Sequence, residues 1–239
     1  METAKEEKQR VEDVSSWYLE GQLDFDIRLI QYRYQTLKPF LRGEKGLELG
    51  PAEGQMTKFL INDFKELTIV DGASELLALI PDSDNLIKVH SLFEDFKPEE
   101  KYHTIIMEHI LEHVDKPVEI LELVKEWLDP ESGYFILGVP NANSYHRLAA
   151  VKMDLLAHQS DLNPRDVAQG HRRVYTHETF RNDIEAAGLR IVEMGGTFFK
   201  PLTNGQIQKT WTPEMMDGFY KLGKDFPENA ADIYAVCQL

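Results

Sequence analysis

"GLELGPAEG", residues 46–54, is an apolar stretch that runs directly into a short segment of glycine, proline and alanine. This pattern is typical of a β-strand that ends in a tight turn before a helix, and parallel sheets bind their ligands at such strand ends. Glu48 precedes the turn and Glu53 lies within it. The two acids would repel a pyrophosphate, the group that glycine-rich loops of this kind commonly bind. The loop therefore favours a ligand that carries a cationic amino or sulfonium group.

Apolar strand candidates alternate with helix candidates around this loop. The predicted strands are residues 46–50, 67–71, 85–90, 102–108, 133–140, 189–196 and 232–238. The predicted helices are residues 54–64, 74–80, 117–128, 176–188 and 212–223. Strands that alternate with helices indicate a parallel sheet with helices on both faces. The sequence therefore predicts an α/β fold, a doubly wound, Rossmann-like, mostly parallel seven-stranded sheet.

Two segments depart from this alternation. Residues 5–40 carry apolar side chains at helical spacing, which predicts an N-terminal helical cap over residues 1–42 before a main domain at 43–239. Residues 141–170 form an insertion after the fifth strand, with one short helical piece. Long insertions in compact domains are usually functional or disordered. Because this one carries aromatic, histidine and arginine residues, we expect it to form a lid over the substrate.

The composition narrows the classes of partner and compartment. The chain has 239 residues, 42% apolar and 28% charged, with a formal net charge of -15. This charge opposes binding to a phosphate backbone, which depends on Lys and Arg, so a nucleic-acid partner is disfavoured. The polar N-terminus predicts no signal peptide, and no apolar run is long enough to span a membrane. The single cysteine, Cys237, permits no disulfide within the chain, which suits a cytoplasmic protein.

A second acid, Asp71, ends the next predicted strand 23 positions after Glu48. A carboxylate at that place accepts hydrogen bonds from ribose hydroxyls, in NAD and in S-adenosylmethionine (SAM) alike. Asp71 also suits a turn or a helix N-cap, because "DGAS" follows. Since Glu48 and Glu53 suit a pyrophosphate badly, NAD is the less favoured of the two cofactors.

Five segments in order carry a family resemblance: "GLELGPAEG", "LTIVDGASELL", "VHSLFEDF", "IIMEHILEHVDKPVEIL" and "GYFILGVPNANS". This series resembles the motifs of class I SAM-dependent methyltransferases, and most of all the group of ubiquinone-biosynthesis-type O-methyltransferases. The resemblance covers residues 46 to about 200. It implies a SAM cofactor, and it implies a cofactor-binding set of Glu48, Gly50, Pro51, Ala52, Gly54, Asp71, Gly72, Leu92, Phe93, Glu108 and His109.

Within that set, the resemblance places the methionine part of SAM at residues 48–54, the ribose at Asp71 and the adenine near Leu92 and Phe93, with Glu94 as a further partner. Two positions depart from the family pattern. Ala52 replaces the usual middle glycine of the loop, so the backbone there must accommodate a Cβ atom. His103 stands where the family often has an aspartate.

"HILEH", residues 109–113, follows the fourth predicted strand and places His109, Glu112 and His113 on one side of a helical turn. Similar ubiquinone-type and small-RNA 2′-O-methyltransferases bind magnesium through a Glu-x-x-Glu-His motif and a later histidine. By that resemblance Glu112, His113 and His171, with His109 in place of the first Glu, are candidate ligands of a divalent metal. The loss of that carboxylate weakens a magnesium site, and zinc, iron or manganese is the alternative ion. Two other interpretations stay open: His113 or His171 acts as a general base, or the motif only shapes the pocket.

The acceptor-binding candidates lie after the fifth strand and beside His171. They are Asn141, Asn143, Tyr145, His146, Arg147, Arg172 and Tyr175. Arg172, Arg173 and Tyr175 suit an anionic group, while turn formation is the alternative for the asparagines. Arg33 is predicted to form a surface salt bridge, with the SAM carboxylate as its alternative partner.

The sequence thus predicts an enzyme that transfers a methyl group from SAM to an oxygen or nitrogen atom of a small polar metabolite, such as a sugar, an amine or an acid. Two alternatives are a metal-dependent RNA 2′-O-methyltransferase and a non-catalytic, methyltransferase-like binding subunit. The acceptor itself is not determined, and a homodimer is left open.

Overall fold

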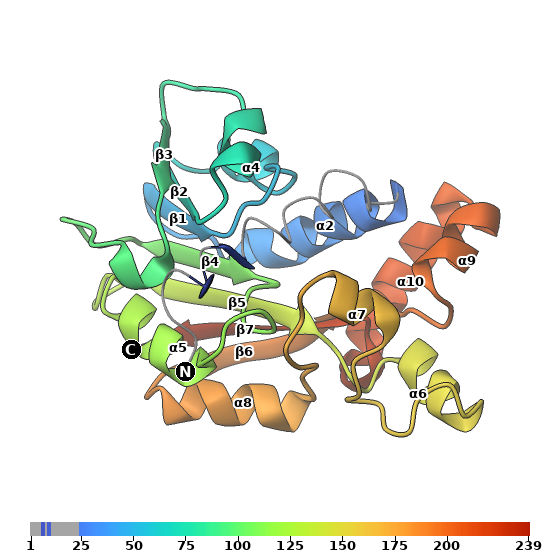
Figure 1. The fold of residues 1–239 in the computed structure, drawn as a ribbon. Helices are drawn as coiled ribbons and strands as arrows, with labels where there is room; N and C mark the ends of the chain where they lie inside the picture. Colours follow the sequence, from blue (N-terminus) through green and yellow to red (C-terminus); the bar gives the residue numbers. More distant parts are fainter. Residues whose placement is uncertain (1–5, 8, 11–23) are drawn as a thin grey trace.

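The strands of the described chain form one twisted sheet (Figure 1). The computed structural model describes residues 6–7, 9–10 and 24–239. Within that part, seven strands occur: β1 (Lys45–Leu49), β2 (Glu66–Asp71), β3 (Leu86–His90), β4 (Thr104–Glu108), β5 (Tyr134–Pro140), β6 (Arg190–Thr197) and β7 (Asp232–Gln238). They lie in the order β3-β2-β1-β4-β5-β7-β6. Strands β1 to β5 are parallel, and β7 runs antiparallel to both neighbours. The predicted mostly parallel, seven-stranded sheet is confirmed.

Helices cover both faces of this sheet. They are α2 (Asp24–Leu37), η1 (Lys38–Phe40), α3 (Thr57–Leu60), α4 (Ser74–Leu79), η2 (Phe93–Asp95), α5 (Pro117–Lys125), α6 (Tyr145–Lys152), α7 (Pro164–Ala168), α8 (His177–Ala186), α9 (Asn204–Thr210), α10 (Pro213–Asp225) and η3 (Pro227–Asn229). Alternate strand residues face opposite sides. Ile105 and Met107 thus pack into the core under α5 and α8, while Ile106 joins the core under α3 and α4. A strand buried on both faces explains the continuous apolar runs in the sequence.

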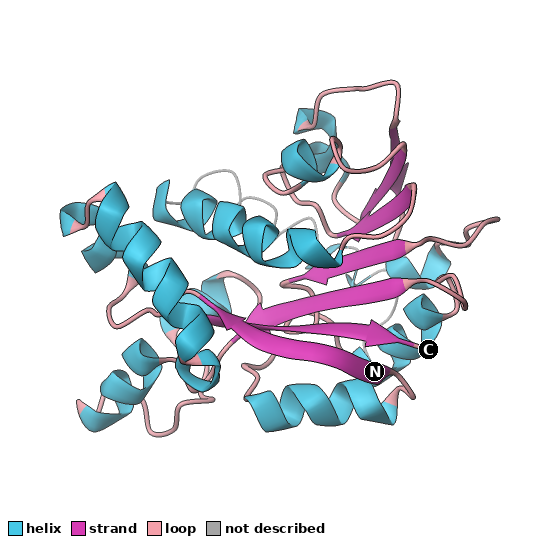
Figure 2. Ribbon diagram, turned by 180° about the vertical axis from the view of Figure 1, so that it is seen from behind, coloured by secondary structure: helices cyan, strands magenta, loops and turns pink. Residues whose placement is uncertain are grey.

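The first described long helix, α2, packs against the C-terminal helices and not against the sheet alone. Phe25 of α2 meets Phe198 edge to face and Tyr32 stacks on it, and the Tyr32 hydroxyl donates to Asp217 of α10 at 2.6 Å. Figure 2 shows α2 beside α9 and α10, and α2 and α9 are in contact. Residues 1–5, 8 and 11–23, which belong to the predicted cap, lie outside the described residues. The domain boundary at residue 42 stays a prediction.

The insertion at 141–170 contains two helices, α6 and α7, where the sequence analysis predicted one. Asn163 caps α7 by accepting hydrogen bonds from the backbone N–H groups of Arg165 and Asp166, and Pro164 occupies the first helical position. Proline is favoured there because its missing N–H has no helical partner in any case. The pattern Asn-Pro-x-Asp at residues 163–166 therefore marks the start of α7, although the segment has no apolar periodicity that would predict a helix.

Two other helices differ from the prediction. The helix predicted at 54–64 is shortened to α3, Thr57–Leu60, because Gly54 has a φ of 79° and the Asn62 side chain donates to the carbonyls of Lys58 and Phe59. Helix α9 was not predicted, since its sequence "NGQIQKT" has only Ile207 buried and no apolar stripe. In the part of the chain that the structure describes, no helix is both long enough and apolar enough to cross a membrane.

Candidate cofactor and acceptor site

Two cavities meet at the loop that follows β1. The larger has a volume of about 760 Å³, and the smaller about 120 Å³. Gly50, Ala52, Ile110 and His113 line both cavities. These residues follow β1 and β4, which are adjacent parallel strands, so their carboxyl ends meet at one edge of the sheet. The loop 50–54 therefore separates two spaces that a single elongated ligand can occupy.

The loop has the left-handed backbone angles that its glycines predict. Gly50 and Gly54 have φ angles of 66° and 79°, in the left-handed region that glycine adopts without cost. A Cβ atom at residue 50 would lie 2.1 Å from Ile110 Cδ1, so another residue there would require the Ile110 side chain to move in addition to a positive φ. Ala52 also has a positive φ, of 48°. The loop thus accommodates alanine in place of the family's middle glycine, but at the cost of backbone strain at residue 52.

Ala52→Gly is expected to stabilise the protein by about 1 kcal/mol, because it removes the strain of an L-residue in the left-handed region. Urea unfolding of the ligand-free protein measures the change. The matched control is Ala149→Gly on the exposed face of α6, which should destabilise the protein by about 1 kcal/mol. Equal destabilisation by both variants would show that residue 52 carries no strain.

Asp71 connects the two loops around the smaller cavity. Its carboxylate accepts a hydrogen bond from the Ala73 N–H at 2.8 Å and from the Ala52 N–H at 3.2 Å. Gly72, Leu92, Phe93 and Glu94 line the same cavity. The structure therefore brings together the residues predicted to hold ribose and adenine, and it shows that Asp71 also stabilises the turn, the alternative that its sequence allowed.

Glu48 lies buried beneath the loop, at 4% exposure, and lines the larger cavity with Gly50, Pro51 and Ala52. Its Oε2 accepts a hydrogen bond from the Thr57 hydroxyl at 2.6 Å. Burial raises the pKa of the Glu48 carboxyl to about 7, against the opposing effect of that hydrogen bond. The acid is therefore only partly ionised at neutral pH, and a cationic ligand group beside it would favour its charged form.

Buried charged groups line the larger cavity at the end of β4. Glu108 is half-buried, and loss of hydration raises the pKa of its carboxyl to about 8. Asp232, at the start of β7, lies 3.5 Å from the Arg33 Nε and 3.5 Å from the His109 Nε2. Arg33 thus forms a salt bridge as predicted, but not at the surface, because its side chain is only 12% exposed and lines the cavity. Asp232 was not predicted, since "DIYAVC" shows only a strand.

Glu112, His113 and His171 form the cluster that the "HILEH" motif suggested. Their ligand atoms lie within 4.8 Å of one another, and the His113 and His171 rings are 4.8 Å apart. Neither Glu112 oxygen accepts a hydrogen bond from the described residues, and burial raises the pKa of this carboxyl well above its ordinary value. A divalent cation would compensate such a group, so the donor set of one carboxylate and two imidazoles fits a metal.

His109 stands outside that three-residue cluster. Its Nδ1 lies 3.3 Å from Glu112 Oε1, and its φ of 58° is in the left-handed region. Burial lowers the pKa of the His109 imidazole to about 4, so the ring is neutral near pH 7. The structure places His109 between Glu112 and Asp232 as a bridging side chain, and the predicted four-residue metal set is reduced to three.

Comparison with known protein families now identifies the chain. A model of the methyltransferase domain matches residues 22–194, most of the sequence. The chain belongs to this methyltransferase family. No curated protein matches the sequence significantly.

Solved structures of methyltransferases share the fold. A SAM-dependent methyltransferase from Mesorhizobium loti has a TM-score of 0.61 and 14% identity, over 87% of this chain and 98% of its own. The N-methyltransferase NodS from Bradyrhizobium japonicum, in complex with S-adenosylhomocysteine (SAH), has a TM-score of 0.56 and 14% identity, over 99% and 98%. The plantazolicin methyltransferase BpumL, bound to a desmethylPZN analogue and SAH, has a TM-score of 0.58 and 13% identity, over 98% and 96%. The fold is thus that of class I SAM-dependent methyltransferases.

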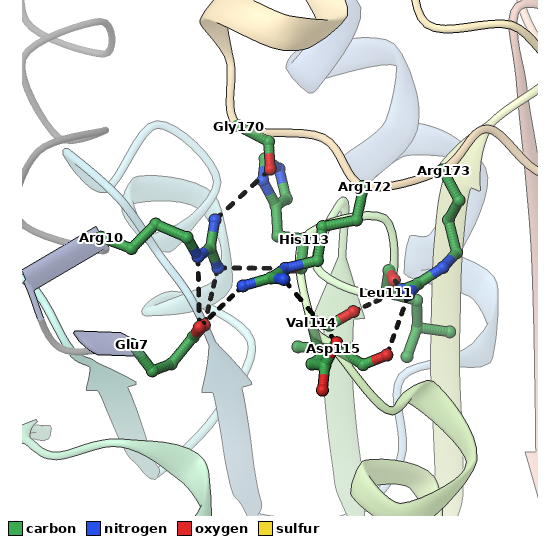
Figure 3. Close-up of polar contacts among 9 residues, drawn as sticks. All are labelled: Glu7, Arg10, Leu111, His113, Val114, Asp115, Gly170, Arg172 and Arg173. Atoms are coloured by element: carbon green, nitrogen blue, oxygen red, sulfur yellow. Dashed lines mark hydrogen bonds and ion pairs between the residues drawn. The ribbon is translucent and has the colours of Figure 1, made fainter. Parts of the chain in front are cut away.

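Two arginines predicted to bind an anionic group support the backbone of this methyltransferase instead (Figure 3). Arg172 Nε donates to the His113 carbonyl at 2.8 Å. Arg173 donates to the carbonyls of Leu111, Val114 and Asp115. Both side chains therefore hold the segment that carries His113. The sequence shows that both arginines are cations near His171. It does not show that residues 111–115 lie beside them, because that follows from the fold.

The described part of the N-terminal segment joins the same contacts. Arg10 donates to the carbonyls of His113 and Gly170, and Glu7 forms ion pairs with Arg10 and Arg172 (Figure 3). Glu7 and Arg10 also line the smaller cavity. These residues thus lie against the predicted adenosine site of the methyltransferase.

The remaining acceptor candidates divide into two groups. His146 and Arg147 line the larger cavity. Asn141 lines it as well, but its amide is engaged by the carbonyls of Glu228 and Ala230 and by the Asn143 N–H.

Three candidates do not line either cavity. Asn143 contributes its backbone carbonyl to the Asn229 amide. Tyr145 is 42% exposed and stacks on Phe199. The buried Tyr175 hydroxyl donates to Asp183 at 2.9 Å. These contacts give the three residues structural roles. Of the candidates that line the larger cavity, Arg147 is also engaged, because its guanidinium donates to Asp166 and to the carbonyls of Gln159 and Asp161.

Proposed function

We propose that this chain transfers a methyl group from SAM to an oxygen or nitrogen atom of a small polar metabolite. The observation that carries the proposal is the pair of cavities that meet at the loop 50–54. The smaller has a carboxylate, Asp71, at the place where a ribose is bound in this class of sheet. The larger has room beyond the loop for a second reactant.

The cofactor would lie across the loop. Asp71, Gly72, Leu92 and Phe93 would hold its adenosine part, and the loop residues with Glu48 and Glu108 would surround its methionine part. The guanidinium of Arg33 suits the methionine carboxylate, because it lines the larger cavity and is only loosely paired with Asp232, at 3.5 Å. When bound, SAM supplies an already activated methyl group, so the protein contributes mainly proximity and alignment.

His113 has the properties of a general base for a hydroxyl acceptor. It lines both cavities, and burial with the nearby charge of His171 lowers its pKa well below the ordinary value. The imidazole is therefore neutral at physiological pH and has a free lone pair for a proton. An amine acceptor needs only to be unprotonated when it attacks, so the base does not decide between oxygen and nitrogen.

The cavity and the charge of the chain favour a small acceptor. A volume of about 760 Å³ lies within the range of about 300–1,000 Å³ that is typical of small-molecule sites. Helices α6 and α7 contribute to its wall through Arg147, Ala150, Arg165 and Asp166. The net charge of -15 opposes a polynucleotide. These features argue against the RNA methyltransferase alternative.

A divalent metal at Glu112, His113 and His171 is the competing role for this cluster. An imidazole lone pair that binds a metal cannot accept a proton, so His113 has one role or the other. If the metal role is right, added Zn²⁺ or Mn²⁺ should raise the melting temperature of the metal-stripped protein by several degrees through preferential binding to the folded state. His171→Ala should remove the shift, and His158→Ala, an exposed control, should retain it. An unchanged melting temperature with both ions would exclude the metal site.

The proposed function is tested by a screen of small hydroxylated and amino metabolites with methyl-labelled SAM. Transfer of the label to a small acceptor, with production of SAH, supports the proposal. SAM binding without transfer to any acceptor would favour the non-catalytic binding subunit. Absence of SAM and SAH binding would contradict the proposal as a whole.

A further inference from the structure

Lys200 is a cation in the larger cavity that the sequence did not single out. It follows β6 and lines the cavity with Asn204 of α9. Of the other described lysine and arginine side chains of the lining, Arg147 is paired with Asp166 at 2.9 Å and Arg165 with Asp26 at 2.8 Å. Arg33 lies 3.5 Å from Asp232 and is the cation proposed above for the methionine carboxylate of SAM. Lys200, by contrast, forms no ion pair with any described carboxylate within 4.0 Å.

The position of Lys200 is fixed by neutral groups. Its Nζ donates to the Asn204 side-chain oxygen at 2.9 Å, and its carbonyl accepts from the His146 N–H of helix α6 at 3.2 Å. The Asn204 amide nitrogen in turn donates to Asp26 at 2.5 Å. An ammonium has three protons to donate, so one hydrogen bond to an amide leaves it able to bind a further acceptor.

Burial supports the same conclusion. Loss of hydration lowers the pKa of the Lys200 ammonium to about 8, although Asp232 and Asp26 oppose the shift. The ammonium is thus partly desolvated, and the Asp232 and Asp26 carboxylates that act on it lie beyond the 4.0 Å of an ion pair. A ligand anion in direct contact would supply a close counter-charge and would strengthen the charged form of the amine.

We propose that Lys200 binds a carboxylate of the methyl acceptor, so the acceptor is a small carboxylic acid. The inference rests on the proposed methyltransferase function and narrows its acceptor class. A carboxylate is favoured over a phosphate because Lys200 is the one cation among the described lining residues that has no ion pair, and because Asp26 and Asp232 oppose any further negative charge beyond the one that Lys200 neutralises. His146 shares the cavity wall as a neutral group, since burial lowers the pKa of its imidazole to about 2.

The first test needs no turnover. The SAH-loaded protein is treated with a trinitrophenylating reagent, which attacks neutral amines, and modification of Lys200 is followed by mass spectrometry. The probes are short hydroxy- and amino-carboxylic acids, their carboxamides and their phosphorylated counterparts. We expect at least one carboxylic acid to slow modification of Lys200 about tenfold, and its carboxamide to have no effect. Lack of protection by every carboxylic acid, or equal protection by carboxamides, would overturn the proposal. If only the phosphorylated probes protect Lys200, the carboxylate assignment is wrong and the group that Lys200 binds is a phosphate.

The second test uses methyl transfer. For an acceptor acid found with labelled SAM, Lys200→Met should lower kcat/KM about tenfold or more, the usual scale for a lost hydrogen bond to a charged group. The same variant should change kcat/KM for the matched carboxamide by less than about twofold. Lys200→Arg should restore part of the loss, and the exposed control Lys209→Met should leave kcat/KM unchanged. An equal loss with acid and carboxamide would show that Lys200 only supports the fold.

The outcomes separate this inference from the proposed function. If SAM and SAH fail to stabilise the protein, the methyltransferase proposal itself fails. If SAM binds and neutral or cationic metabolites are methylated without any effect of Lys200→Met, the proposed function holds and the carboxylate assignment alone is wrong.

Discussion

Asp71→Ala is expected to abolish the thermal stabilisation that SAM gives to the wild-type protein. At a SAM concentration of about 100 times its dissociation constant, binding contributes about 2.7 kcal/mol, which corresponds to roughly 5–10 °C for a chain of this size. Asp71 lines the smaller cavity at the end of β2, where a carboxylate can accept hydrogen bonds from two ribose hydroxyls. Differential scanning fluorimetry with SAM and with SAH measures the shift.

The same carboxylate also accepts the N–H groups of Ala52 and Ala73, so a second variant is needed. Asp71→Asn retains one oxygen for the turn but loses the charge, and it should weaken the shift without unfolding the loop. Asp84→Asn, on an exposed turn, is the matched control and should respond to SAM like the wild type. A full shift in Asp71→Ala would contradict the placement of ribose.

His113→Gln is expected to lower kcat for a hydroxyl acceptor by a factor of about 10²–10⁴, the usual contribution of a general base. Because the pKa of His113 is lowered well below its ordinary value, the base stays neutral. Protonation of His113 should therefore not lower the wild-type kcat between about pH 8 and pH 6, where an ordinary histidine would become protonated. Steady-state kinetics on an acceptor found by the labelled-SAM screen measures both effects.

Two comparisons make the result specific to His113. His158→Gln, an exposed histidine of the insertion, should retain the wild-type rate. His171→Gln should lower the rate less than His113→Gln, because His113 lines both cavities and His171 only the larger. Retained SAM stabilisation in His113→Gln would confirm that the cofactor still binds. A rate within a few-fold of wild type in that variant would show that His113 is not the base.

The sequence predicted the parts of the site that depend on local pattern. The loop after β1 was recognised because Gly50 and Gly54 punctuate an apolar run, and Asp71 because it ends the next strand. Adjacent parallel strands place their ends together, so these residues had to meet once the strand order was right. The helices of the insertion were harder, since α7 depends on a capping box at Asn163 and has little apolar periodicity.

Residues whose contacts depend on the packing of segments far apart in the chain could not be predicted from the sequence. The sequence around Asp232 shows only a strand, and the sequence around Lys200 shows only a loop. Both side chains line the larger cavity because the fold brings β7 and α9 to its wall. Arg172 was expected to bind a ligand because it is a cation near His171. The fold instead brings the His113 carbonyl within 2.8 Å of its Nε. Charge and proximity in sequence do not reveal which carbonyls a guanidinium will meet.

A crystal structure of the protein with SAH tests the central claim most directly. We predict adenosine in the smaller cavity with both ribose hydroxyls hydrogen-bonded to Asp71, and homocysteine across the loop 50–54 beside Glu48 and Glu108. The sulfur atom should face the part of the larger cavity that His113 lines. SAH bound elsewhere, or a ribose that makes no contact with Asp71, would contradict the account.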